Sequence, residues 1–206
     1  MRILITGFDP FGGETINPAY EAVQMVSDSA GGADIVKLEV PTVFRKGAAM
    51  VIEKLREIKP DAVLSVGQAG GRAGITVEFV GINYIEARHP DNEGQAPDGE
   101  IIAADGEDAY FATLPVREIA EHINAHGIPA SVSYSAGTYV CNDVLYSVLH
   151  YARHHAPALK AGFIHVPFAP EQVVGKREGL PSMHIGDIAK ALEYAIEVIV
   201  CCVDGR

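Results

Sequence analysis

The sequence predicts a single α/β domain over residues 1–206, with a mixed, mostly parallel twisted sheet between two layers of helices. Short, β-branched apolar runs alternate with longer amphipathic segments through most of the chain, which is typical of α/β proteins. Several of these runs are apolar on both faces, as expected of strands that helices cover on both sides. A chain of 206 residues can bury one substantial core, and no linker, internal repeat or block of like charge marks a second domain.

The predicted strands are short runs rich in Val and Ile. The longest, "ITVEFVGINY", is interpreted as one continuous strand. The expected strands cover residues 2–6, 34–40, 62–66, 75–84, 130–135 and 162–166.

Capping residues mark the predicted helices. Asn17 is expected to cap the first helix, with Pro18 at its first helical position. Thr138 is expected to cap the fourth, whose apolar face carries Val144 and Val148 at helical spacing. The expected helical segments are 17–28, 45–60, 115–127, the segment after Thr138, and 185–200. Residues 85–109 are rich in glycine, proline and turn pairs and predict a long loop that is functional or mobile, such as a lid over a pocket.

Composition narrows the classes of partner. The formal net charge is -11, from 27 acidic and 16 basic residues, which disfavours binding to nucleic acid or to an anionic membrane. The apolar N-terminal run is too short for a signal peptide, and no run approaches the roughly 18 residues of a membrane helix. Three unevenly spaced cysteines make no disulfide framework and indicate a reducing, cytoplasmic setting.

Cys141 is the cysteine whose position suggests chemistry. It is expected in the first turn of the fourth helix, where the helix N-terminus stabilises a thiolate. A small buried packing residue is the alternative, and packing is the expected role of the adjacent pair Cys201 and Cys202.

A cysteine nucleophile needs a histidine to carry its proton and a third group to orient that histidine. His165 ends an apolar strand, and catalytic groups collect at such strand ends, although a satisfied core histidine is the alternative. Glu78 is a lone carboxylate in an apolar strand, so it either has a partner or faces water from an edge strand. Together with Cys141, these residues fit a Cys–His–Glu site.

Metal and cofactor chemistry is not expected. His150 and His154 have the spacing of a metal-ligand pair on one helix face, but no third ligand matches them. Their position is explained instead by the helix C-terminus, where positive charge is favourable.

Five segments, in order along the chain, carry a resemblance to a known family. They resemble the motifs of pyroglutamyl-peptidase I, also called pyrrolidone-carboxylate peptidase. The resemblance runs from the first residues to the end of the fifth segment and covers almost the whole chain. The segments are "GFDPFGGETINP", "VGQAGGRAGITVE", "ARHPDNEG", "SAGTYVCN" and "GFIHVPFAPEQ".

The resemblance implies a cysteine peptidase that removes N-terminal pyroglutamate from peptides and proteins. It also implies a fold similar to purine nucleoside phosphorylases, assembly as a homotetramer, and no cofactor. The nucleophile, catalytic histidine and acidic partner of the family match Cys141, His165 and Glu78. Residues that match its substrate-binding positions are Phe8 and Phe11, which hold the pyroglutamyl ring, Gln68 and Val140 nearby, and Arg88 close to the nucleophile.

Three positions depart from the family pattern. Phe79 stands where a basic residue is usual, Gly81 where alanine is usual, and His89 where isoleucine commonly lines the pocket. These departures raise an alternative, an inactive relative that binds capped peptides. A second alternative is a nucleoside phosphorylase-like enzyme, but "GFDPFGG" lacks the lysine of a phosphate loop.

Overall fold

The strands form two sheets in this computed structural model, which describes residues 1–203 and 205. The strands are β1 (Arg2–Phe8), β2 (Ser29–Ala30), β3 (Ala33–Val40), β4 (Ala62–Gln68), β5 (Ile75–Glu78), β6 (Val80–Ile82), β7 (Ala109–Phe111), β8 (Ala130–Ser133) and β9 (Lys160–Val166). Over the described residues, seven strands form the main sheet in the order β2-β3-β1-β4-β9-β5-β8, and β6 pairs with β7 in a small second sheet.

The main sheet is mixed but mostly parallel, as predicted. Strand β1 runs parallel to both β3 and β4, β4 runs parallel to β9, and β5 runs parallel to β8. The antiparallel pairs are β2 with β3 and β5 with β9. The carboxyl ends of β1, β4 and β9 therefore meet at one edge of the sheet, where the amino end of antiparallel β5 also lies.

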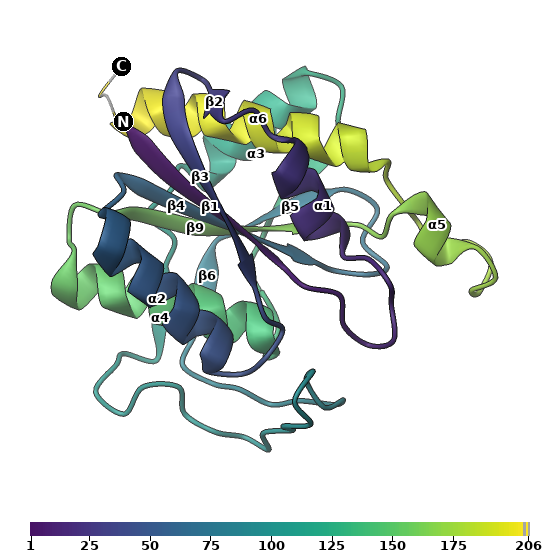
Figure 1. Ribbon diagram of the computed structural model, residues 1–206, viewed down its shortest axis with the longest axis horizontal. Coiled ribbons are helices and arrows are strands. Elements are labelled where there is room, and N and C mark those ends of the chain that lie inside the picture. The colour runs from purple at the N-terminus through teal and green to yellow at the C-terminus, as the bar shows by residue number, and fades with distance from the viewer. Residues whose placement is uncertain (204, 206) are drawn as a thin grey trace.

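Helices cover both faces of the main sheet. They are α1 (Pro18–Met25), α2 (Lys46–Ile58), α3 (Val116–Ala125), α4 (Val140–His155), the short α5 (Pro170–Val173) and α6 (Ile185–Val203). Figure 1 shows α1, α3 and α6 above the sheet and α2 and α4 below it. Along β1, Ile3 and Ile5 pack in the upper core and Leu4 in the lower core, so one strand serves two hydrophobic layers. The α/β/α prediction is confirmed, and the chain forms one domain.

The prediction of one strand over residues 75–84 is wrong. Strand β5 ends at Glu78, and the chain then leaves the main sheet to form β6, which pairs with β7. At the break, the Phe79 N–H donates to the Ser133 carbonyl and the Phe79 carbonyl accepts from Ala112. The hydrophobic pattern is continuous across this point, so it carries no sign that the chain changes its pairing partner.

One predicted helix cap is confirmed and another is wrong. The Asn17 side chain accepts a hydrogen bond of 3.1 Å from the Ala19 N–H at the start of α1. Helix α4, however, is capped by Tyr139 without a side-chain hydrogen bond, because the Thr138 hydroxyl donates instead to the Glu86 carbonyl. Cys141 is consequently the second helical residue of α4.

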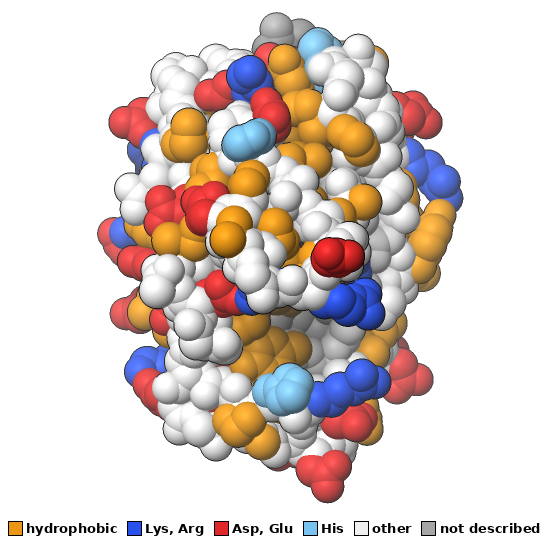
Figure 2. All heavy atoms as spheres, turned by 90° about the vertical axis from the view of Figure 1, so that its right-hand side faces the viewer, with side chains coloured by type: hydrophobic (Ala, Val, Ile, Leu, Met, Phe, Trp, Pro, Cys, Tyr) orange, Lys and Arg blue, Asp and Glu red, His pale blue; other side chains and the backbone are white. Residues whose placement is uncertain are grey.

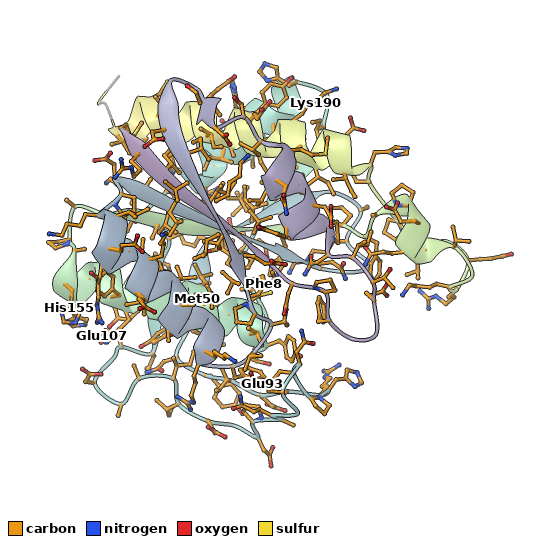
Figure 3. All side chains as sticks on the ribbon, viewed as in Figure 1. Phe8, Met50, Glu93, Glu107, His155 and Lys190 are labelled. Carbon is orange, nitrogen blue, oxygen red and sulfur yellow. The ribbon has the colours of Figure 1, made fainter. Side chains whose placement is uncertain are left out.

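The loop over residues 85–109 is held in place by its own polar groups. The buried carboxylate of Asp91 accepts the Phe44 N–H at 2.9 Å, and Asn92 donates to Asp9 and to the Pro10 carbonyl. The Tyr139 hydroxyl donates to the Pro90 carbonyl at 3.1 Å. The middle of this loop is thus tied to the N-terminal loop and to the start of α4. Glu93, labelled in Figure 3, lies on it below the helices.

Two sequence expectations concern the surroundings of the protein. In the part of the chain that the structure describes, every helix is too short or too polar to cross a membrane. Cys141, Cys201 and Cys202 are all free thiols.

Candidate active site

A cavity of about 570 Å³ opens where β1, β4 and β9 end. Figure 2 views the molecule from that side and shows a hollow with hydrophobic side chains in its floor. Four of the five motif segments contribute residues to the cavity lining, and the third segment does not. Its lining includes Phe8, Phe11, Asn17, Thr42, Gln68, Arg72, Ser135, Gly137, Tyr139, Cys141 and His165.

The side chain of Cys141 packs against the main chain of β4 at Gly67. The thiol is half-buried, and a Cβ atom built on Gly67 would lie only 2.8 Å from its Sγ. In the register of the two parallel strands, Gly67 is paired with His165 of β9. The start of α4 therefore places the sulfur of Cys141 against Gly67, the residue of β4 that pairs with His165. The side chains of Cys141 and His165 line the same cavity.

His165 and Glu78 form a buried pair between neighbouring antiparallel strands. Nδ1 of His165 lies 2.7 Å from Oε1 of Glu78, and the two side chains are 4% and 0% exposed. Because Glu78 occupies Nδ1, Nε2 is the ring nitrogen left for the cavity. The alternative in which Glu78 faces water from an edge strand is wrong, because β5 lies between β9 and β8.

The ionisation of this pair follows from burial and its hydrogen bonds. Burial disfavours the charged form of Glu78, but the hydrogen bonds with His165 and Arg72, beside the nearby Ser133 hydroxyl, prevail and hold its pKa below the ordinary value. Burial also lowers the pKa of His165, against the opposing effect of Glu78. At neutral pH the site therefore holds a carboxylate beside a neutral imidazole, which can accept a proton.

The thiol of Cys141 is protonated in this environment. Burial raises its pKa to about 12, and the Glu78 carboxylate adds to that effect, although Arg72 and the backbone N–H of Cys141 oppose it. The expectation of a thiolate stabilised by the helix start is not met, because burial outweighs the helix N-terminus. Attack by sulfur must then accompany transfer of its proton to a base.

The predicted substrate-binding residues divide into two groups. Phe8, Phe11 and Gln68 line the cavity with Cys141. Phe8 lies near the centre of the molecule at the end of β1, as Figure 3 shows, and is 2% exposed. Val140 is fully buried in the lower core, and exposed Arg88 lines an adjoining cavity of about 760 Å³. The structure therefore does not place these two side chains beside the nucleophile.

Sequence reasoning missed several residues of the cavity wall, among them Tyr139 and Arg72. Tyr139 stands between the two cavities, 6.3 Å from Phe11 and 5.1 Å from Phe44 between ring centroids. Arg72 donates to Glu78 from the loop between β4 and β5. The need of a buried carboxylate for a cationic partner could have pointed to Arg72, six positions before Glu78 in the same motif segment.

The three departures from the family pattern lie at the edge of the site or outside it. Phe79 points into an aromatic cluster, with ring centroids 5.0 Å from Phe111 and 5.6 Å from Tyr134. Gly81 packs against α4, and His89 is exposed in the adjoining cavity. None of the three lines the cavity that holds Cys141 and His165.

The histidines of α4 belong to a separate cluster. His150 Nδ1 and His154 Nε2 each lie 3.3 Å from the Tyr110 hydroxyl. Across the described residues, no three His, Cys, Asp or Glu side chains gather in the way that a metal ion requires.

A thiol at a helix start, facing one cavity with a buried imidazole–carboxylate pair, defines a cysteine-type hydrolase on an α/β/α scaffold. The family comparison is more specific. The model of the pyroglutamyl peptidase family matches residues 1–201, and the chain belongs to that family.

Several known members are similar to this chain. A pyrrolidone-carboxylate peptidase of Thermoanaerobacter sp. is 54% identical over 199 residues, which are 97% of this chain and 98% of that protein. The crystal structure of pyroglutamyl peptidase I from Bacillus amyloliquefaciens is 48% identical with a TM-score of 0.92, covering 96% of this chain and 94% of that one. A variant of pyrrolidone carboxyl peptidase from Pyrococcus furiosus is 41% identical with a TM-score of 0.93, covering 97% and 98%.

These comparisons do not favour either alternative, the inactive binder or the nucleoside phosphorylase-like enzyme. The expected likeness of the fold to purine nucleoside phosphorylases stays a prediction.

Proposed function

We propose that this chain hydrolyses the bond after an N-terminal pyroglutamyl residue, with Cys141 as nucleophile, His165 as acid–base and Glu78 as its orienting partner. The observation that carries the proposal is the His165–Glu78 pair of 2.7 Å opening onto the cavity that holds the Cys141 thiol, in a member of the pyroglutamyl peptidase family.

The reaction begins with a neutral thiol and a neutral imidazole. As Sγ of Cys141 attacks the carbonyl carbon of the pyroglutamyl residue, at its bond to the next residue, the proton of the thiol passes to Nε2 of His165. The tetrahedral oxyanion collapses to a thioester, the C–N bond breaks, and His165 returns the proton to the departing amine. Water then attacks the thioester with His165 as base, which releases pyroglutamate and restores the thiol.

Glu78 and the start of α4 stabilise the charges that develop. The carboxylate holds Nδ1 of His165, which fixes the tautomer and stabilises the imidazolium formed during attack. The backbone N–H of Cys141 lies in the first turn of α4, where N–H groups have no partner within the helix, and is the proposed donor to the oxyanion.

The pyroglutamyl ring is a flat lactam without a free amine. The rings of Phe8 and Phe11 supply an apolar surface for it on the cavity wall. Gln172 donates to Oε1 of Gln68 at 2.9 Å, which leaves the Gln68 amide N–H₂ to bind the lactam carbonyl. Val140 and Arg88 contribute from the core and from the adjoining cavity rather than by contact at the thiol.

The proposal is tested with a fluorogenic pyroglutamyl amide. The wild-type protein is expected to release the fluorophore and to lose that activity after alkylation with iodoacetamide, whereas Cys201→Ser/Cys202→Ser protein keeps both properties. Cys141→Ser and Cys141→Ala are expected to abolish release. Near-normal turnover by either Cys141 variant would exclude the cysteine from the reaction.

Peptides and proteins with an N-terminal pyroglutamate are the proposed partners, and a homotetramer is the proposed assembly. An exposed aromatic cluster supports self-association, because Phe111 is 66% and Tyr134 60% exposed. Sedimentation velocity tests this, and a single species with the mass of one chain would contradict it.

A cytoplasmic location is likewise proposed. It is supported by three free thiols, two of them exposed, which a reducing compartment preserves. Fractionation of the source cells with an antibody against the chain tests it.

A further inference from the structure

Arg72 lies within the second motif segment, but it is not among the matched site residues and has no role in the proposed mechanism. It lies in the loop between β4 and β5 and lines the cavity, with its side chain 32% exposed. Its Nη1 donates to Oε1 of Glu78 at 2.6 Å and also to the Thr76 hydroxyl. Its Nη2 donates to the Ser135 carbonyl at 3.1 Å. The guanidinium is therefore fixed at three points, two on β5 and one in the segment that follows β8.

The bond to Glu78 matters because of the state of that carboxylate. Oε1 of Glu78 accepts hydrogen bonds from both His165 and Arg72. Oε2 is buried and has no hydrogen-bond partner within the described residues. A fully buried carboxylate with one unsatisfied oxygen is stable as an anion only with a close positive charge. The imidazole is neutral before reaction, so Arg72 is the cation that supplies this charge.

We propose that Arg72 is a positioning residue for catalysis, which keeps Glu78 ionised and directed at His165. The inference rests on the proposed function of the Cys141, His165 and Glu78 site. Arg72 acts through Glu78, because Nη1 of Arg72 and Nδ1 of His165 both bond to Oε1 of Glu78. The bond from Arg72 thereby holds the carboxylate in the orientation in which Oε1 accepts the hydrogen bond of the imidazole.

The direction of the pH effect follows from the titratable and charged groups around Glu78. These are His165 from β9, Cys141 from α4 and Arg72 itself, with the neutral Ser133 hydroxyl from β8. Arg72 lowers the pKa of all three of its titratable neighbours, through its hydrogen bond at Glu78 and through its positive charge at Cys141 and His165. Removing Arg72 raises each of these pKa values, so the acidic limb of the activity profile, where His165 must lose its proton, moves to higher pH.

The test compares Arg72→Gln with Arg117→Gln, a loss of the same charge at an exposed arginine of α3. On a pyroglutamyl amide, kcat of Arg72→Gln is expected to fall by about 10- to 100-fold, less than the roughly 10²- to 10⁴-fold that an acid–base group itself contributes, because Arg72 acts only through Glu78. KM is expected to stay nearly constant and the acidic limb to move to higher pH. Arg117→Gln is expected to match the wild type in all three quantities.

Arg72→Lys separates charge from geometry. Lysine restores a positive charge but lacks the fork that binds Glu78 and Ser135 together, so the acidic limb is expected to return toward its wild-type position while kcat recovers only in part. An acidic limb that does not move in Arg72→Gln would show a merely structural ion pair. A raised KM with unchanged kcat would make Arg72 a substrate ligand. Either result overturns the inference.

Alkylation keeps the test independent of turnover. The rate at which iodoacetamide modifies Cys141 reports its thiolate fraction, and at a fixed pH it is expected to be lower in Arg72→Gln than in the wild type or Arg117→Gln. Equal rates in folded protein, judged by circular dichroism, would contradict the inference. If the wild type itself released no pyroglutamate, the proposed function would fail, while the alkylation rates would still decide whether Arg72 governs the site.

Discussion

Gly67 of β4 and Cys141 of α4 pack directly against each other, with only 2.8 Å between Sγ and the place where a Cβ of residue 67 would be. The same Cβ would lie 2.8 Å from the Phe163 ring. The thiol can occupy its position only because β4 carries no side chain there.

Gly67→Ala is therefore expected to displace the thiol and to lower kcat by about 10²-fold or more, since a 1 Å misplacement of a reacting group costs that much. Gly186→Ala is the matched control, because a Cβ there would meet only the end of the Met25 side chain at 4.0 Å. Steady-state assays on a pyroglutamyl amide compare the two. Full activity in Gly67→Ala would show that the contact does not position the sulfur.

Glu78→Gln is expected to lower kcat and to move the acidic limb of kcat/KM to lower pH. Glu78 raises the pKa of His165, so its neutral replacement lets the imidazole lose its proton at a lower pH. This direction is opposite to that expected for Arg72→Gln. A pH–rate series from pH 4 to 9 measures the shift. Movement to higher pH would place Glu78 outside the acid–base pair.

Gln68→Leu is expected to reduce the preference for pyroglutamyl over prolyl amides. The ring of proline lacks the lactam carbonyl to which the Gln68 amide is proposed to donate, and a site built to pair a polar atom discriminates by that pairing. The ratio of kcat/KM for the two substrates should fall by about tenfold or more. Gln24→Leu on the exposed face of α1 is the control. An unchanged ratio would assign recognition of the lactam to backbone groups.

Gly81→Ala restores the residue usual in the family and is nevertheless expected to destabilise this chain. A Cβ at Gly81 would lie 3.0 Å from the Tyr146 nitrogen and 3.1 Å from Leu145, so β6 and α4 would have to separate. Overpacking of this kind costs about 1–3 kcal/mol. Urea unfolding at neutral pH measures it. Equal stability would mean that the small sheet shifts freely against the helix.

The sequence predicted the alternation of strands and helices well, because a strand that is buried on both faces appears in the sequence as a continuous apolar run. Strand β1, with Ile3 and Leu4 in different cores, is such a case. It failed at Glu78, where β5 and β6 belong to different sheets although the apolar run continues. Which strand a segment pairs with depends on distant residues such as Ser133 and Ala112, and no local pattern contains them.

The residue types of the site were visible in the sequence because the motif segments single out Cys141, His165 and Glu78. The partners of those residues were not. Arg72 reaches Glu78 through a turn between two strands, and Arg88 lies in a neighbouring cavity although its motif suggested a place beside the thiol.

The sequence by itself determined the alternating α/β pattern, the family and the three reactive side chains, since each is written in local composition and order. Only the tertiary structure decided their ionisation. The neutral thiol, the neutral imidazole and the charged carboxylate follow from burial and from hydrogen bonds between β5, β9 and α4, and the energy of an ion depends on everything that surrounds it in space.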